Sequence, residues 1–576
     1  MKLKFMREFQ PYLFESLRTY TKEKFMADLM SGIIVGIVAL PLAIAFGIAS
    51  GVAPEKGIYT AIIAGFIVSF LGGTSVQIGG PTGAFIVIVY GIVEQFGVQG
   101  LALATFLAGI MLILMGVLKL GNVIKFIPYP IVVGFTSGIA LTIFSTQIKD
   151  FFGLTTPKLP AGFFEKWGIY FQNFSSVNIW ATAIAVLSVI IIVVTPKIWK
   201  RIPGSLLAII FMTVGAYLLK EFGGITGIET IGDRFAINSS LPGIRPIGIN
   251  LESIRLLFPS AFTIAMLGAI ESLLSATVAD GVTGHKHNSN VELTAQGIAN
   301  MVVPFFGGIP ATGAIARTMT NINNGGKTPV AGIIHSIVLL LILLFLGGLT
   351  KHIPMACLAG VLVIVAYNMS EWRTFISLTK QSKDTLMILL TTFGLTVVFD
   401  LTVAIQVGLL LAVFAFIKRM NESTQVSLTT DLLDISKEIE SHSGNLKDEV
   451  LHLPRGIEVY EIDGPFFFGV ATKFDEKMHE IGDAPNVRII RMRKVPFIDS
   501  TGMYNLETLC KSAKKEKIQI ILSGVIDSVG EKLKRSKVVE LVGEENICAN
   551  IHLAVERAIV VNEEIIEKKR RKLKSL

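Results

Sequence analysis

Long apolar stretches separated by short polar connections dominate the first 420 residues of the chain. Crossing a bilayer as a helix takes about 20 mostly apolar residues, because hydrocarbon offers no partner to an open backbone group. Twelve stretches approach this description, at 28–50, 57–73, 100–120, 128–149, 178–198, 203–220, 256–279, 291–306, 329–348, 354–368, 384–399 and 401–417. The pattern predicts a polytopic α-helical membrane protein.

Two further segments, 82–97 and 313–324, are shorter and rich in glycine and threonine. They begin just after Pro81 and Pro310, respectively. Counting them brings the expected number of transmembrane segments to about fourteen.

The short segments belong to an internal repeat. Phe70-Leu71-Gly72-Gly73 precedes Thr82-Gly83-Ala84, and Phe305-Phe306-Gly307-Gly308 precedes Thr312-Gly313-Ala314, with offsets of 235 and 230 residues between the copies. Seven segments per copy is an odd number, so the second copy is expected to be inverted in the membrane. Interrupted segments at matching places in two halves indicate the binding site of a transporter. The alternative is that the TGA tripeptide recurs by chance.

Charge divides the chain into two parts. Residues 1–420 hold 28 basic and 18 acidic residues, whereas residues 421–576 hold 24 and 26. A soluble domain carries about 25% charged residues, so only the second part has an ordinary soluble composition. Basic residues gather in alternate connections between the apolar stretches, and such connections usually lie in the cytoplasm. We therefore expect both termini in the cytoplasm and the chain in the inner (plasma) membrane. The basic excess therefore orients the protein and does not indicate nucleic-acid binding.

The polar C-terminal part has an α/β pattern. Strand-like runs lie at 459–462, 487–492 and 518–522, and a helical stretch lies near 529–536. We expect a cytoplasmic N-terminus at 1–27, a transporter domain at 28–420, a linker at 421–450, an α/β domain at 451–563 and a basic tail at 564–576.

The sequence lacks the residues that characterise several other classes of protein. Cys357, Cys510 and Cys548 are too scattered for a disulfide framework or a thiolate metal site. No GxxxxGK[ST] phosphate loop supports a primary pump, and no nucleophile–base pair supports an enzyme. His285-Lys286-His287 reads as a solvated loop rather than a metal site. No cofactor is expected beyond a coupling ion, H⁺ or Na⁺.

Motifs in both halves resemble the SulP family of anion transporters. Those of the first half are Asp28-Leu29-Met30-Ser31-Gly32, Pro41-Leu42-Ala43 and Gly80-Pro81-Thr82-Gly83. Those of the second half are AIESLLS at 269–275, HNSN at 287–290 and GGKTP at 325–329. Asp499-Ser500-Thr501-Gly502 is similar to the signature loop of a STAS domain. The resemblance covers nearly the whole chain.

This resemblance implies a seven-plus-seven inverted repeat divided into a core and a gate domain, followed by a cytoplasmic α/β STAS domain. It also implies a homodimer, and a substrate held between the facing N-termini of the third and tenth segments. The STAS domain is a candidate site for a cytoplasmic protein partner.

The residues at these two segments suit an anion. A helix that begins within the membrane presents unpaired N–H groups and the positive end of its dipole. The glycines of both tripeptides allow an anion to approach the backbone closely, and the threonines offer hydroxyl groups. Inserting an arginine into the membrane costs about 2.5–3.5 kcal/mol, so Arg317 is expected to face a binding site rather than lipid. The alternatives are that Arg317 pairs with Glu271 and that Phe85 only packs in the core. The candidate substrate-binding residues are Thr82, Gly83, Ala84, Phe85, Thr312, Gly313, Ala314 and Arg317.

Glu271 is the second intramembrane charge to explain. Burial favours the neutral form of a carboxyl, so Glu271 is expected to exchange a proton near neutral pH. Importing one negative charge against an inside-negative potential costs about 2.3 kcal/mol per 100 mV, which a co-transported cation offsets. Together with Ser275, Glu271 could instead ligate Na⁺. Relatives that look sodium-coupled tend to have aspartate at this position, so glutamate favours protons.

The leading prediction is a secondary active importer of a small anion, namely sulfate, bicarbonate or a dicarboxylate, whose uptake is coupled to protons. The alternatives are a Na⁺-dependent bicarbonate symporter and, from another class, an anion channel or a membrane sensor that signals through its STAS domain. Ser500 and Thr501 resemble the phosphorylated position of stand-alone STAS proteins, although a loop of two hydroxyls before a helix can also be an N-cap.

Overall fold

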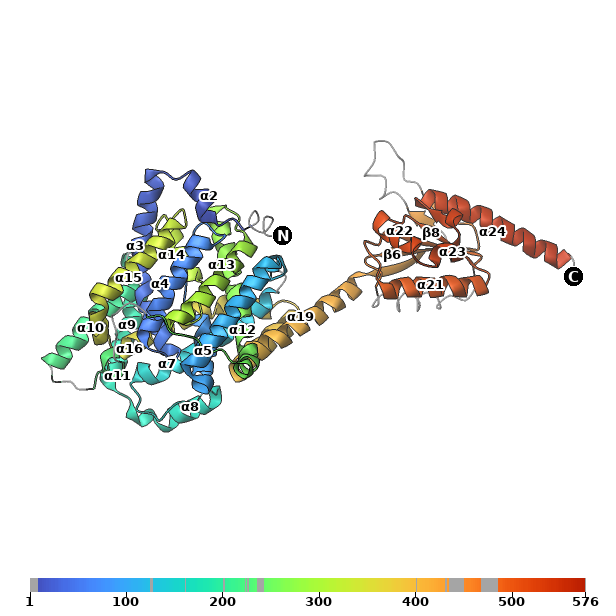
Figure 1. The fold of residues 1–576 in the computed structure, drawn as a ribbon. Coiled ribbons are helices and arrows are strands. Elements are labelled where there is room, and N and C mark those ends of the chain that lie inside the picture. The colour runs from blue at the N-terminus through green and yellow to red at the C-terminus, as the bar shows by residue number, and fades with distance from the viewer. Residues whose placement is uncertain are drawn as a thin grey trace. The chain divides into compact units, whose positions relative to one another are not determined.

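The chain divides into two units, Met1–Ala412 and Val413–Leu576 (Figure 1). The computed structural model describes residues 9–124, 128–160, 162–199, 203–222, 224, 227–235, 243–399, 401–429, 432–434, 450–467 and 485–574. Helices dominate the first unit, and a five-stranded sheet organises the second. This division separates the apolar part of the sequence from the highly charged part.

Within the described ranges, ten helices are long and apolar enough to cross a membrane, judged by length and composition. One of them, Gly83–Val117, contains two of the expected segments, because two helices meet at Gly97, whose φ of 67° and ψ of −173° are not helical. Three more expected segments form helices of 14, 9 and 16 residues, α13, α14 and α18. All fourteen expected segments therefore coincide with helical structure, which confirms the predicted fold class.

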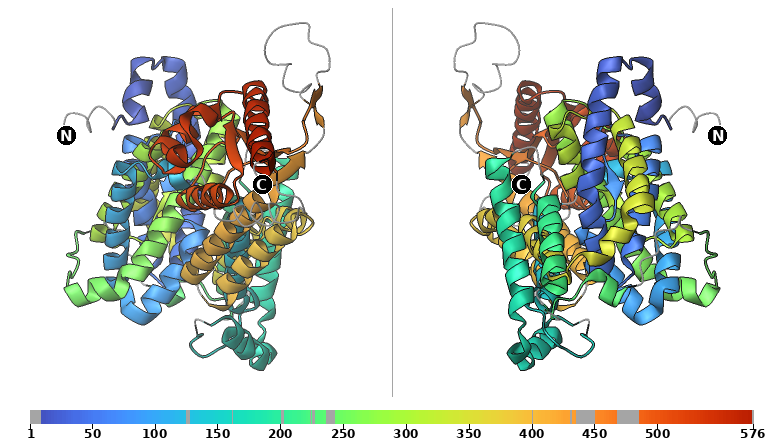
Figure 2. Two further views of the ribbon diagram at one scale, coloured as in Figure 1. Left: turned by 90° about the vertical axis from the view of Figure 1, so that its right-hand side faces the viewer. Right: turned by 90° about the vertical axis from the view of Figure 1, so that its left-hand side faces the viewer.

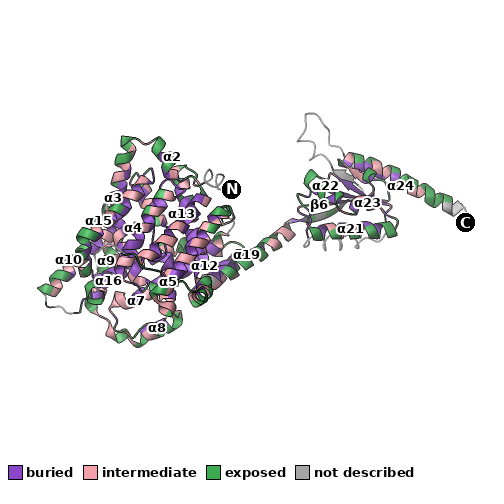
Figure 3. Ribbon diagram, viewed as in Figure 1, coloured by how far each residue is buried: buried purple, intermediate pink, exposed green. Residues whose placement is uncertain are grey.

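Seven helices pack into a first bundle. Their bounds are Lys22–Ala49 (α3), Pro54–Leu71 (α4), Ile86–Val117 (α5), Leu251–Thr283 (α12), Ser289–Val302 (α13), Ile315–Asn323 (α14) and Val330–Leu346 (α15). Helices from both halves of the sequence interleave here, since α5 packs on α12 and α13, and α15 packs on α3 and α4. Buried residues gather in the middle of this unit and exposed residues on its outer faces (Figure 3).

A second bundle lies beside the first, and appears teal and gold beside blue and light green in Figure 2. It contains Tyr129–Phe152 (α7), Ile179–Ile198 (α9), Gly204–Glu221 (α10), Met355–Met369 (α16) and Lys383–Val398 (α18). Helix α7 packs on α16 and α18, and α9 packs on α10 and α16. Leu401–Ser423 (α19) follows α18 and crosses the boundary between the two units. The two bundles match the division into core and gate.

Several short elements connect these helices. They are Tyr12–Arg18 (α2), Gly121–Ile124 (α6), Phe163–Gln172 (α8), Phe174–Ser176 (η2), Ile231–Arg234 (α11), Val303–Phe306 (η3), Gly347–His352 (η4) and Trp372–Thr379 (α17). The hydropathy pattern did not predict α8, because it is amphipathic and only 10 residues long. Its Trp167 and Tyr170 pack against the end of α7, which holds α8 in place.

One glycine is required where α3 and α4 meet. A side chain on Gly57 would collide with the backbone carbonyl of Ala43. The two helices therefore contact each other through their backbones, which fixes the first helical pair of the core.

The second unit is a sheet with strand order β3-β6-β7-β8-β9, in which β3 is antiparallel and the others are parallel. The strands are Gln425–Thr429 (β3), Ile457–Asp463 (β6), Val487–Lys494 (β7), Gln519–Ser523 (β8) and Ile547–Cys548 (β9), and Leu432–Asp434 (β4) pairs with Val450–His452 (β5). The three predicted strands are thus confirmed as β6, β7 and β8. The sheet begins at Gln425, within the segment expected to be a linker.

Alternation along β7 places helices on both faces of this sheet. Ile490 and Met492 belong to a cluster with residues of Ser500–Lys515 (α21), Asp527–Lys534 (α22) and Val538–Val542 (α23). Val487 and Ile489 point to the other face, where Ile551–Lys574 (α24) packs. Helix α24 continues to Lys574, into the segment 564–576 that we expected to form a basic tail.

A buried carboxylate fastens the start of α3 to the connection between α14 and α15. Asp28 is fully buried, and its oxygens accept hydrogen bonds from the N–H groups of Lys327 (2.7 Å) and Thr328 (3.1 Å). They also accept the hydroxyls of Thr328 (2.5 Å) and Tyr20 (3.1 Å). This contact fixes one end of the short helix α14.

Replacing Asp28 with alanine should lower the midpoint of thermal unfolding in detergent. The substitution leaves the buried N–H and hydroxyl of Thr328 without an acceptor, and each unpaired buried group costs about 1–3 kcal/mol. Asp28→Asn retains one acceptor oxygen and should lie between the wild type and the alanine variant. An alanine variant that unfolds at the wild-type temperature would contradict the assigned role.

Candidate functional site

A short pair of strands brings two helix starts together. Gly79–Gly80 (β1) pairs with Thr312–Gly313 (β2) in antiparallel register, with Gly79 opposite Gly313 and Gly80 opposite Thr312. A 3₁₀ turn at Gly83–Phe85 (η1) leads from β1 into α5, and α14 begins two residues after β2. Segments more than 200 residues apart in the sequence therefore begin their helices beside each other.

The first helix start carries an unsatisfied hydroxyl. Thr82 is the N-cap residue in extended conformation (φ −127°, ψ 159°) and makes no side-chain cap bond. Its Oγ1 is buried without a partner among the described residues. Such an atom is costly unless something fills its hydrogen-bonding capacity.

The backbone at this helix start faces the second bundle. A Cβ atom on Gly83 would lie 2.9 Å from the sulfur of Met369 and 3.4 Å from Cδ1 of Ile143. These residues belong to α16 and α7, respectively, so the start of the helix lies at the boundary between the two bundles.

The second TGA tripeptide is used differently. The Thr312 hydroxyl lies 2.6 Å from that of Ser272 and donates to the carbonyl of Gly268 (3.0 Å), while the N–H of Gly313 donates to Ser272 Oγ (3.1 Å). Thr82 is thus an N-cap, whereas Thr312 lies in a strand and bonds to α12. The two tripeptides do not occupy equivalent places, although the segments that contain them meet. The Thr312 hydroxyl is engaged within the core.

Helix α14 begins without a side-chain cap. Ala314 is its N-cap residue, and the Ala314 N–H donates to the carbonyl of Ile78 (2.9 Å). The N–H groups of the first turn have no partner within a helix. They are available to a ligand at the end of the strand pair.

Arg317 lies across the two helix starts. It is 2% exposed, and its guanidinium donates to the carbonyls of Gly79 (3.4 Å) and Pro81. A side chain on Gly80, whose φ is 150°, would collide with this guanidinium. Among the described residues no carboxylate forms an ion pair with Arg317, so the expected alternative, a pair with Glu271, is not formed. Within the part of the chain that the structure describes, this buried positive charge therefore has no carboxylate counter-ion.

The remaining residues of the two tripeptide segments are apolar and buried. Ala84, Phe85 and Ala314 are 0%, 1% and 6% exposed, respectively. The Phe85 ring approaches Gly268 of α12, where an added Cβ would lie 3.7 Å from its Cζ. This contact favours a packing role for Phe85.

Glu271 and Ser275 lie one turn apart on α12. Glu271 is 8% exposed, and Glu371, the N-cap residue of α17, is the charged group that acts on it. The Ser275 hydroxyl donates to Thr318 Oγ1 (3.3 Å), which in turn accepts the N–H of Ile78 (3.1 Å). Ser275 is therefore connected to both α14 and the segment before β1, while Glu271 experiences the negative charge of Glu371.

His335 of α15 was missed by the analysis of the sequence. It is fully buried, and Arg317 is its charged neighbour. The sequence did contain a sign of this residue, because a histidine is unusual within an apolar run such as VAGIIHSIVLLL.

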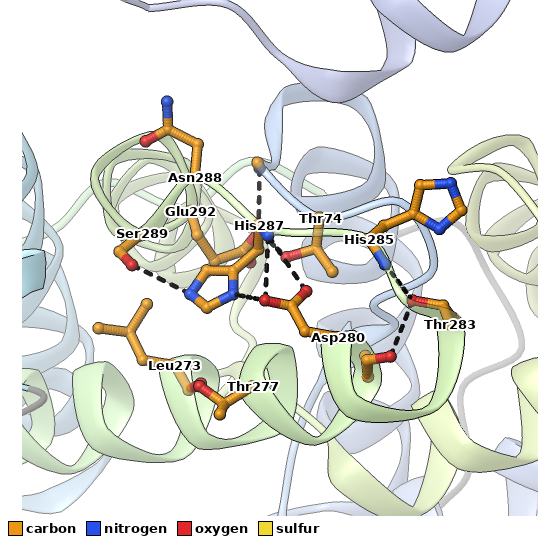
Figure 4. Close-up of polar contacts among 12 residues, drawn as sticks. Thr74, Leu273, Thr277, Asp280, Thr283, His285, His287, Asn288, Ser289 and Glu292 are labelled. Atoms are coloured by element: carbon orange, nitrogen blue, oxygen red, sulfur yellow. Dashed lines mark hydrogen bonds and ion pairs between the residues drawn. The ribbon is translucent and has the colours of Figure 1, made fainter.

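The turn between α12 and α13 is held by a polar network (Figure 4). Nδ1 of His287 lies 2.7 Å from Asp280 Oδ2, the His287 N–H donates to the same carboxylate (3.1 Å), and Nε2 lies 3.0 Å from Ser289 Oγ. The neighbouring Glu292 accepts the hydroxyl of Thr74 (2.9 Å) and the N–H of Gly73 (3.0 Å). The His287 side chain, which is 4% exposed, is thus structural and not part of a solvated loop, and Asp280 stabilises the turn.

In the second unit, Asp499 is the N-cap residue of α21, and its carboxylate accepts the N–H of Gly502 (2.7 Å). Ser500 and Thr501 are exposed in the first turn. The capping role therefore belongs to Asp499, which leaves both hydroxyls accessible.

The comparisons with known proteins agree with this architecture. Residues 25–392 match the sulfate permease family, and residues 451–558 match the STAS domain. The chain is 40% identical to "Putative sulfate transporter YvdB" of Bacillus subtilis (strain 168), over 92% of this chain and 96% of that protein. It is 30% identical to "Bicarbonate transporter BicA" of Synechocystis sp. (strain ATCC 27184 / PCC 6803 / Kazusa), over 85% and 86%.

A solved structure described as "The overall structure of SLC26A9" has the same fold, with a TM-score of 0.85 at 18% identity over 98% of this chain and 95% of that one. The family match covers most of the helical unit, and the relatives extend over both units. The chain belongs to the sulfate permease family, and it is a multi-pass membrane transporter with a C-terminal STAS domain.

Proposed function

We propose that this chain is a secondary active importer of a small inorganic or organic anion, driven by protons. The observation that carries the proposal is the buried Arg317, which has no carboxylate partner among the described residues. An isolated buried charge is strongly unfavourable, and a bound anion removes this cost. The two helix starts and the unpaired Thr82 hydroxyl supply further donors at the same place.

The substrate class follows from this chemistry and from the relatives. Two of them are named for sulfate and for bicarbonate transport. A site made from one guanidinium, helix N-termini and a hydroxyl suits either oxyanion, and also a dicarboxylate. We assign the substrate to this group of anions.

The two bundles suggest how the anion crosses the membrane. Arg317, β1, β2 and both helix starts belong to the first bundle, and Gly83 faces Ile143 and Met369 of the second. Movement of the first bundle against the second would expose the same site to either side of the membrane. The second bundle acts as the gate in this scheme.

Glu271 is the proposed coupling residue. It lies on the first bundle and is influenced by Glu371, which follows α16 of the second. Protonation of Glu271 would remove the repulsion between these carboxylates, so a proton would change the interaction between the bundles. Na⁺ held by Glu271 and Ser275 is the competing possibility, and it predicts a different driving ion.

The orientation and assembly are part of the proposal. Basic connections support cytoplasmic termini in an inner (plasma) membrane, and the family resemblance supports a homodimer. The exposed hydroxyls of Ser500 and Thr501 support regulation by phosphorylation or by a protein that binds the STAS domain.

Substitution of Arg317 tests the anion site. Arg317→Ala should weaken uptake of radiolabelled sulfate and bicarbonate into proteoliposomes by roughly tenfold to hundredfold in KM, because a hydrogen bond to a charged group contributes about 1.5–3 kcal/mol. Arg317→Lys keeps the charge and should lose less. If the alanine variant has wild-type KM values for all anions tested, Arg317 is a structural residue only.

Substitution of Glu271 tests coupling. Glu271→Gln mimics the protonated carboxyl and cannot release a proton, so accumulation driven by an inward proton gradient should disappear. Exchange of labelled for unlabelled anion should persist, and its rate should no longer depend on pH between roughly 5 and 8.

Ser275→Ala serves as the matched variant for the sodium alternative. It should leave proton-driven accumulation intact. Accumulation that follows a sodium gradient and that Ser275→Ala reduces would show that the driving ion is Na⁺ instead.

A further inference from the structure

A cavity of about 520 Å³ extends along α5 from its first turn. Ile86 and Val87 line one end, and Gly162 and Lys166 from the α8 region line another part. Residues of α7, α12, α18 and α19 complete the wall. The cavity therefore connects the surroundings of the first helix start with helix α8.

Of the described residues that line this cavity, Lys166 alone is charged. It is 3% exposed, and no carboxylate among the described residues lies within ion-pair distance of it. Its ammonium group lies over the ring of Tyr90 of α5, with the ring centroid 5.7 Å from Nζ. Desolvation lowers the pKa of Lys166, and the Glu94 carboxylate opposes this shift from a greater distance. Glu94 itself lies 3.9 Å from Nζ of Lys158.

A second, smaller cavity of about 160 Å³ shares Tyr90, Thr146 and Lys166 with the first. Its other charged lining residues are Lys149, Asp150 and Arg234, of which Asp150 and Arg234 form an ion pair of 2.7 Å. Lys149 and Lys166 remain as positive charges without an ion pair among the described residues. Both cavities around Tyr90 are therefore electropositive.

We propose that Lys166, held over Tyr90 between these two cavities, forms a second anion-binding station that supplies the site at the helix starts. The ligand class is a small free oxyanion such as sulfate or bicarbonate. A charge in a cavity with low-dielectric walls raises the local concentration of oppositely charged solutes. Lys149 extends this attraction on one side of Tyr90, and the polar side chains of Thr142 and Thr146 line the path along α5.

This inference rests on the proposed transport of anions, and it assigns α8 a role in capture. A station that only captures the anion should affect KM and leave kcat unchanged, because it does not contact the anion at the helix starts. It should also make KM sensitive to ionic strength, because the attraction is electrostatic.

The test uses the full chain in proteoliposomes of phosphatidylcholine and phosphatidylethanolamine, which contain no anionic headgroup that could occupy the cavity. Lys166→Met keeps the apolar stem over Tyr90 and removes the charge. The KM for radiolabelled sulfate should rise about tenfold, kcat should stay unchanged, and the dependence of KM on ionic strength should weaken. Lys166→Arg should behave as the wild type does.

Lys158→Gln is the matched control, because Lys158 belongs to the same α7–α9 connection but its side chain is 82% exposed. It should leave KM unchanged. Binding of labelled sulfate to purified Arg317→Ala protein gives a second measurement. Weak residual binding is expected there, and adding Lys166→Met should abolish it.

The outcomes separate the two proposals. If the wild type takes up no anion, the proposed function fails, and the capture station fails with it. If the wild type takes up sulfate but Lys166→Met has an unchanged KM, or Arg317→Ala shows no residual binding, only the station is refuted. Equal loss of folded protein in the methionine and arginine variants would assign Lys166 to packing and would also overturn the inference.

Discussion

The need to satisfy backbone groups where a helix begins inside the membrane governs this structure. Hydrocarbon offers no hydrogen bonds, so an interrupted helix is tolerated only where protein or a ligand supplies partners. Here the chain meets this constraint with the pairing of β1 and β2, which satisfies the extended residues before each helix. The first-turn donors beyond the strands remain, and Arg317 adds a positive charge beside them.

The core is arranged around that strand pair. Ser272 of α12 bonds to both residues of β2, and Ser275 reaches Thr318 on α14. Asp28 secures the far end of α14, and the network around Asp280 and Glu292 fixes the turn between α12 and α13. These contacts join the two sequence halves into one bundle. Across the boundary between the bundles, α3 contacts α10 and α16, and α5 contacts α7. This boundary is where the proposed movement of one bundle against the other would occur.

Much of this could be predicted from hydropathy, because lipid requires long apolar helices, and glycine and proline mark the interrupted ones. The TGA repeat located the two helix starts correctly. It did not reveal that Thr312 turns toward Ser272 while Thr82 stays unpaired, since identical tripeptides lie in different backbone conformations. Helix α8 was not predicted, because an amphipathic helix lacks a long apolar run. The partners of His287 and Lys166 could not be predicted either, because they depend on tertiary contacts.

The hydrogen bonds that Arg317 donates have one further consequence. Two of its donors are committed to the carbonyls of Gly79 and Pro81, so the guanidinium has less of its planar fork available for a ligand. Recognition through that fork would discriminate between a flat and a tetrahedral oxyanion. A site that offers mainly a positive charge and backbone N–H groups would instead accept anions of different shapes. If Arg317 binds the anion as proposed, a change in the neighbouring side chains would be enough to alter anion preference while this arginine stays in place.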